Sequence, residues 1–195
     1  MTLDQFLRDH DKPGAIVLLE GKRDVSPEDI NQLVALGKLL CLRTEHIVFR
    51  SGNAAGSDEY FSKGVVAVDA NRLEVITPYS GHRKKQNQAG YTYSLDEMNI
   101  VEDSPVVTYS KGNKKVANLV DRYMTGDRGR FAIKAAYLLR DTAKVTGVGD
   151  VFPATFGIFY DDLKKPKSGG TGHTMLVCDQ LDVPYCTQEV WIQWL

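Results

Sequence analysis

Short apolar runs that alternate with helical patterns are the feature that most constrains how this chain can fold. The first run, AIVLLEG at residues 15–21, is continuous and ends in glycine, as expected of a strand buried on both faces. Ser26 followed by Pro27 is typical of a helix start, and apolar residues then recur at helical spacing to about residue 43. Further runs repeat this order. The alternation predicts a parallel sheet with helices on its faces.

We therefore predict an α/β fold, a three-layer Rossmann-like fold with a mostly parallel sheet. The chain has 195 residues, 43% of them hydrophobic, and this length and composition favour a single domain covering 1–195. The region 80–112 has no helical period and contains the aromatic alternation YTYS and the β-favouring PVVTYS, so we expect an irregular insertion there that includes a hairpin. The predicted strands cover 15–20, 46–51, 73–78, 154–160 and 183–187.

Composition narrows the functional classes. The 24 basic and 25 acidic residues give a net charge of -1, which argues against nucleic acid as a partner unless the cations form a local patch. Three cysteines without a CxxC spacing fit a reducing compartment, and no apolar run approaches the roughly 18 residues of a membrane span. We predict a cytoplasmic protein without membrane contact. The histidines and cysteines show no metal-ligand spacing, so no metal site is expected.

Three turns at the carboxyl ends of predicted strands contain glycine and small or basic residues. In a doubly wound sheet this edge carries the ligand. Without a Cβ the backbone N–H groups at a helix start can approach an anion, although tight strand-to-helix turns use glycine for geometric reasons as well. Two such turns after apolar strands favour a phosphate-bearing ligand. The candidate ligand-binding residues are Gly21, Lys22, Arg23, Ser51, Gly52, Asn53, Ala54, Asp58, Gly169, Gly170, Thr171, Gly172, His173 and Thr174.

Three of the candidate features carry two interpretations each. Asp58 either contacts the ligand or stabilises a helix N-terminus. His173 either donates to a phosphate or faces solvent, since its ordinary pKa of roughly 6.5 suits both. The basic segment 82–85 either attracts phosphates or nucleic acid, or is a solvated loop.

The glycine turns also carry a resemblance to a known superfamily. SGNAAGSDEYFSKGV resembles the SGGAxGxDxxAxxxA stretch of the SLOG superfamily of Rossmann-like proteins, and GGTGHT is similar to its PGGxGT turn. That superfamily includes the Lonely-guy phosphoribohydrolases, the molybdenum-cofactor carrier proteins and the DNA-processing protein A family. The resemblance implies that Asp58 contacts a ribose hydroxyl and that Arg140 is the helix arginine of the ligand site, with Arg128 and Arg130 as rival positions.

The departure from the superfamily pattern limits the functional inference. The PGGxGTxxE motif of the phosphoribohydrolases ends in a glutamate, whereas SGGTGHTMLVC offers no carboxylate at the matching place. The first hypothesis is thus a protein that binds a nucleotide or phosphate-bearing derivative, with a possible bound nucleotide as cofactor and no identified catalytic residue. The alternatives are an N-glycosidase whose carboxylate is Glu20, Asp24 or Asp58, and a nucleic-acid or protein-partner binding module that uses the 82–85 loop.

Oligomeric state is the last expectation from the sequence. Trp191 and Trp194 lie three residues apart near the C-terminus, where they either cap the core or form an apolar interface. With the resemblance, this pair predicts a homodimer or a higher closed oligomer.

Overall fold

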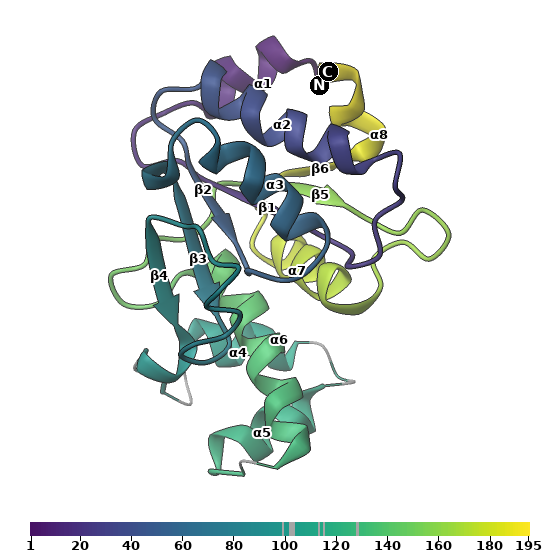
Figure 1. The fold of residues 1–195 in the computed structure, drawn as a ribbon. Helices are drawn as coiled ribbons and strands as arrows, with labels where there is room; N and C mark the ends of the chain where they lie inside the picture. Colours follow the sequence, from purple (N-terminus) through teal and green to yellow (C-terminus); the bar gives the residue numbers. More distant parts are fainter. Residues whose placement is uncertain (99, 102–103, 113, 115, 128) are drawn as a thin grey trace.

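The sheet consists of six parallel strands in the order β4-β3-β2-β1-β5-β6. A computed structural model describes residues 1–98, 100–101, 104–112, 114, 116–127 and 129–195. Figure 1 shows the sheet between two groups of helices. The three-layer α/β prediction is therefore confirmed. The strands are β1 (Ile16–Gly21), β2 (Val48–Ser51), β3 (Leu73–Thr77), β4 (Tyr91–Ser94), β5 (Phe156–Tyr160) and β6 (Tyr185–Thr187).

The helices divide between the two faces of the sheet (Figure 1). One face is covered by α1 (Leu3–His10), α2 (Ile30–Arg43), α3 (Ser57–Val66) and α8 (Gln188–Trp191). The other is covered by α4 (Pro105–Lys111), α6 (Arg130–Thr146) and α7 (Gly169–Gln180), with α5 (Ala117–Met124) packed on α6 at the periphery. The single-turn 3-10 helices are η1 (Ala70–Arg72), η2 (Leu95–Glu97) and η3 (Ile192–Trp194).

The order of the strands in the sheet determines where a crevice for a ligand can open. The chain moves outward from β1 through β2 to β3 and β4, and then returns to β5 on the other side of β1. The loops that leave β1 and β5 consequently diverge to opposite faces, which opens a crevice at the carboxyl ends of these two strands. Both strands are fully buried along their length, as their apolar sequences require.

Two glycines allow the backbones of α2 and α3 to touch. A Cβ on Gly37 would lie against the Phe61 carbonyl oxygen, and a Cβ on Gly64 would lie against the Val34 carbonyl oxygen. The close approach holds α3, which carries Asp58 at its N-terminus, firmly on this face of the sheet.

The predicted hairpin within 80–112 is wrong in two respects. YTYS does form a strand, β4, but it pairs in parallel with β3 at the sheet edge. PVVTYS, which has strand-favouring residues, forms α4 instead, because Ser104 accepts a hydrogen bond from the Val107 N–H as an N-cap and Pro105 stands at the first helical position.

The C-terminal tryptophans belong to the core. Trp191 is fully buried and its Nε1 donates to the Phe159 carbonyl oxygen, while Trp194 is 7% exposed and stacks near Phe6. The apolar surface on which the oligomer prediction relied is therefore covered by this chain itself, and oligomerisation stays a prediction. No helix of the described residues is long and apolar enough to cross a membrane.

We predict that Gly37→Ala destabilises the fold by about 2 kcal/mol, because the added methyl forces α2 and α3 apart. Urea unfolding followed by circular dichroism measures this loss. Lys38→Ala, an exposed change on the same helix, is the control and should shift the free energy of unfolding by less than about 0.5 kcal/mol. Equal stability of the Gly37→Ala variant and the wild type would contradict the close helix contact.

Candidate functional site

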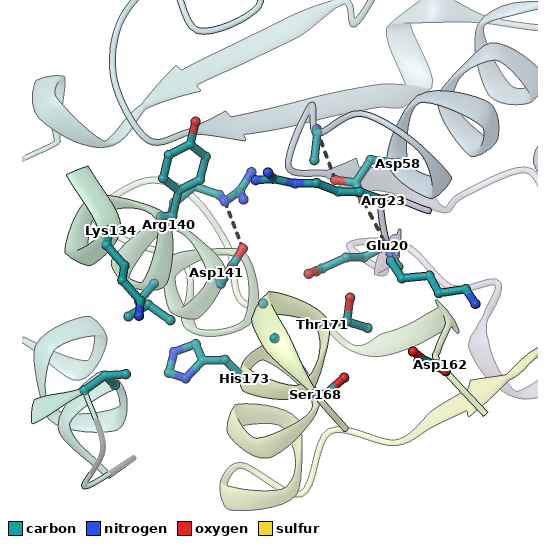
Figure 2. Close-up of a pocket in the computed structure, with 18 of the residues that line it drawn as sticks. Glu20, Arg23, Asp58, Lys134, Arg140, Asp141, Asp162, Ser168, Thr171 and His173 are labelled. Carbon is teal, nitrogen blue, oxygen red and sulfur yellow. Dashed lines mark hydrogen bonds and ion pairs between the residues drawn. The ribbon is translucent and has the colours of Figure 1, made fainter. Parts of the chain in front are cut away.

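A cavity of about 860 Å³ lies in the crevice beside the carboxyl ends of β1 and β5. Figure 2 shows its walls, which come from the β1 and β5 loops, the turn before α3, α6 and the start of α7. It lies where the strand order reverses, the usual position for a ligand site in such sheets. The lining residues used below are Glu20, Lys22, Arg23, Asp58, Arg130, Lys134, Tyr137, Arg140, Asp141, Asp162, Ser168, Gly170, Thr171 and His173.

The Asp58 carboxylate fills the anion position that the glycine turns create. Its Oδ2 accepts from the N–H of Gly52 at 3.0 Å and of Ala54 at 3.4 Å, and from the Ser51 hydroxyl at 3.2 Å. Its Oδ1 accepts from the Gly21 N–H at 3.3 Å. These donors face a carboxylate of the chain itself, so they are not available to an external phosphate.

Beneath Asp58, a buried ion cluster joins α6 to β1. The Lys144 ammonium contacts the Glu20 carboxylate and lies 3.0 Å from Asp141 Oδ1. Arg140 Nε lies 2.9 Å from the same Asp141 oxygen, and its Nη1 donates to the Gly52 carbonyl oxygen. All four side chains are at least 94% buried. Because buried charges are costly unless paired, each member depends on the others.

Glu20 is a member of this cluster whose pKa is raised by its surroundings. Burial, reinforced by Asp141 and Asp58, raises its pKa to about 7 despite the opposing effect of Lys144. Coulombic attraction by Arg140 and Lys144 keeps the pKa of Asp141 below its ordinary value, although burial opposes this. The cluster therefore contains one carboxyl group that exchanges its proton near neutral pH.

Four cations surround the cavity mouth. Arg23, Arg130 and Lys134 are exposed and Lys22 is half-buried. None of the four forms an ion pair with a carboxylate of the described residues. Asp162, whose pKa is lowered chiefly by a backbone hydrogen bond from Lys164, is the acidic residue at this rim. The positive charge at the mouth is thus available to a ligand.

Aromatic rings connect this mouth to a second, smaller pocket. The centre of the Tyr137 ring lies 5.9 Å from the guanidinium group of Arg23 and 5.5 Å from that of Arg140. His82 packs edge-on against Tyr137 on one side and Tyr79 on the other, and desolvation with nearby arginines lowers its pKa to about 4. His82 also lines a pocket of about 300 Å³ with Lys84, at the carboxyl ends of β3 and β4.

The structure places the sequence candidates in three groups. Ser51, Gly52 and Asn53 are buried and do not line the large cavity. Gly172 packs its Cα against the Lys167 backbone, and Thr174 donates to Glu20 below the cavity floor. Arg128 lies outside the described residues. The candidates that line the cavity are Gly21, Lys22, Arg23, Ala54, Asp58, Arg140, Gly169, Gly170, Thr171 and His173.

The main residues that sequence reasoning missed are on α6. Lys134, Tyr137, Asp141 and Lys144 all belong to this helix, and the first three line the cavity. A signal was present, because an arginine, an aspartate and a lysine at 140, 141 and 144 follow the apolar pattern of the helix and so place charges on its buried face. Among the rival carboxylates, Glu20 lines the cavity and Asp24 does not.

Comparison with known proteins gives one structural likeness. No protein-family model and no curated protein matches the sequence. The fold is similar to that of DNA processing protein A from Helicobacter pylori, a structure reported for its single-stranded DNA binding mode. The identity is 16%, the match covers 95% of this chain and 68% of that one, and the TM-score is 0.49.

Two expectations from the sequence are corrected here. They are the nucleotide or phosphate-derivative ligand and the expectation that nucleic acid is an unlikely partner, and the finding against both is the likeness to a protein reported for its single-stranded DNA binding mode. The physical reason for the first is that Asp58 already occupies the N–H groups of the glycine turn. The second failed because a net charge of -1 does not reveal that Glu20, Asp58 and Asp141 are buried whereas three cations at the cavity mouth are exposed.

Replacing Asp58 by alanine should destabilise the protein by about 3 kcal/mol, because it leaves buried N–H groups without an acceptor. Thermal and urea unfolding measure the loss. Glu59→Gln changes the neighbouring, more exposed acid of the same helix turn and should cost less than about 1 kcal/mol. If both variants lost the same stability, Asp58 would act only through the helix dipole.

The Glu20 pKa predicts a pH-dependent difference in stability. Because its folded pKa of about 7 exceeds the ordinary glutamate pKa of 4.5, this group favours the folded state at low pH, and the benefit is lost as the pH rises towards 7. The wild type should therefore lose roughly 3 kcal/mol relative to Glu20→Gln between pH 4.5 and 8. Urea unfolding of both proteins across this range tests it, and a difference independent of pH would contradict the assignment.

Proposed function

We propose that the chain binds single-stranded nucleic acid along the carboxyl-end edge of its sheet, with the large cavity as the principal contact. The observation that carries this proposal is the set of four cations at the cavity mouth that lack ion pairs with the described residues. Exposed lysines and arginines beside a concave surface attract a phosphate backbone, and they release counterions when they bind it.

The shape of the site favours a single strand over a duplex. A cavity of about 860 Å³ can receive an unstacked base, whereas the bases of a duplex are held inside its helix. Tyr137 on the cavity wall is half-buried, and Tyr79 beyond His82 is 41% exposed, so both offer part of an aromatic ring. Stacking of a base on such a ring contributes about 1–3 kcal/mol and is tolerant of sequence.

The pocket beside β3 and β4 extends the same surface. Because His82 contacts Tyr137 and also lines that pocket, the two hollows are neighbours. Of the basic segment singled out in the sequence, Lys84 and Lys85 are exposed, whereas Arg83 pairs with Glu59 at 2.6 Å. A strand that leaves the cavity mouth past Tyr137 would meet Lys84 next.

This proposal rests on the cations and rings of this chain. The Helicobacter pylori protein is reported to bind single-stranded DNA, and the same class of ligand is proposed here on independent grounds. Membership of the SLOG superfamily, a cytoplasmic location and a closed homo-oligomer stay predictions.

The proposal is tested by removing charge from the mouth. In the variant Lys22→Gln/Arg23→Gln/Lys134→Gln, affinity for a fluorescein-labelled 20-nucleotide single strand should fall at least about tenfold at 0.1 M salt. The slope of log affinity against log salt should become shallower by about 2, since each lost phosphate contact removes roughly 0.7. Fluorescence anisotropy across a salt series measures both quantities.

A control variant removes two positive charges at a distance from the cavity. Lys12→Gln/Lys38→Gln removes exposed charges away from the cavity and should leave affinity within about twofold. Wild-type protein should also bind the single strand more tightly than a duplex of equal length. No binding by the wild type, or the same loss in both variants, would overturn the proposed function.

A further inference from the structure

The lower part of the cavity is lined by oxygen atoms that accept hydrogen bonds, whereas its mouth carries cations. In Figure 2 the oxygens of Glu20 and Thr171 point into the open space below the guanidinium groups of Arg23 and Arg140, and a dashed line joins an Asp141 oxygen on the same wall to Arg140. The mouth therefore suits an anionic group, and the carboxylates below it suit a group that donates hydrogen bonds. A ligand that fills the cavity must present both kinds of group at opposite ends.

One carboxylate oxygen of Asp141 is not used in the ion cluster. Its Oδ1 is the oxygen near Arg140 Nε and Lys144 Nζ, at 2.9 and 3.0 Å. No described residue donates a hydrogen bond to its Oδ2. This oxygen faces Gly170, since a Cβ added at Gly170 would lie 3.0 Å from it. The absent side chain at Gly170 thus leaves Oδ2 open towards the cavity that both residues line.

A second acceptor lies on the same wall. His173 is 3% exposed and lines the cavity, and its Nδ1 has no hydrogen-bond partner among the described residues. Its Nε2 lies 2.9 Å from the Thr142 hydroxyl, which donates to the Leu138 carbonyl oxygen, so we assign the ring proton to Nε2. Burial lowers the pKa of His173, which keeps the ring neutral and Nδ1 an acceptor.

We propose that the lower part of the cavity receives a nucleobase with an exocyclic amine, which donates to Asp141 Oδ2, and that it disfavours uracil and thymine. This inference rests on the proposed function. Carboxylates accept from the amine of cytosine, whereas uracil presents a carbonyl oxygen at the same ring position and would place it against Asp141 and Glu20. The phosphate of the same nucleotide remains at the mouth, near the four cations.

Cytosine and uracil form the sharpest test, because they have the same size. Wild-type protein should bind a 15-nucleotide oligodeoxycytidine at least about fivefold more tightly than the matching oligodeoxyuridine, measured by fluorescence anisotropy. In Asp141→Asn the ratio should fall below about twofold, since the amide both donates and accepts.

Gly170→Ala tests the same contact without removing a buried charge. This residue lies in the first turn of α7 without a left-handed φ, so alanine suits its backbone, and the added methyl should cover Asp141 Oδ2 and reduce the cytosine preference. Gln180→Ala, an exposed change at the other end of α7 and outside the cavity lining, is the control and should retain the preference. Circular dichroism confirms that each variant is folded.

The outcomes separate the two proposals. Equal affinity of the wild type for both oligonucleotides, or an unchanged ratio in both Asp141→Asn and Gly170→Ala, would overturn the amine assignment while leaving single-strand binding intact. Failure of the wild type to bind either oligonucleotide would overturn the proposed function and the amine assignment together.

Discussion

The Lys144 ammonium, held between Glu20 and Asp141, is the contact on which the geometry of the site depends. It joins the end of β1 to α6 through side chains that are each at least 94% buried. The backbone of the same residue is also engaged, because its carbonyl oxygen accepts from Arg50 at 2.8 Å, and Arg50 pairs with Glu74 of β3 at 2.6 Å. Loss of one charge would leave its partners buried and unpaired, which is far more costly than loss of an exposed pair.

These ion contacts of Lys144 determine the positions of the exposed cations. The half of α6 that contains Lys144 is fixed by ions, and the other half carries Arg130 and Lys134 over the cavity mouth. From the opposite wall, Lys22 and Arg23 follow directly after β1, whose end is held by Asp58. One buried cluster thus positions basic side chains from two distant parts of the sequence around a single opening.

Strand positions were largely predictable from the sequence because burial on both faces demands continuous apolar runs, as in 15–20 and 154–160. β4 was recognised as a β-forming segment but its pairing was not, since an exposed edge strand carries no signal of its direction. α4 was missed because a capping serine and a first-turn proline outweighed β-branched residues. The candidate site was harder to predict from the sequence than the strands and helices. A pattern of glycines cannot show whether the anion at a turn is a ligand or, as with Asp58, a side chain six residues further on.

The strands at the two sheet edges limit how copies of this chain can associate. β4 has four residues and β6 has three, so each edge offers few unpaired backbone groups to another strand. Natural sheets use such short edges to resist continuation into a neighbouring molecule. An assembly of this chain would consequently have to form through helix surfaces or loops, and the intermolecular sheet extension that leads to fibres is disfavoured by the architecture itself.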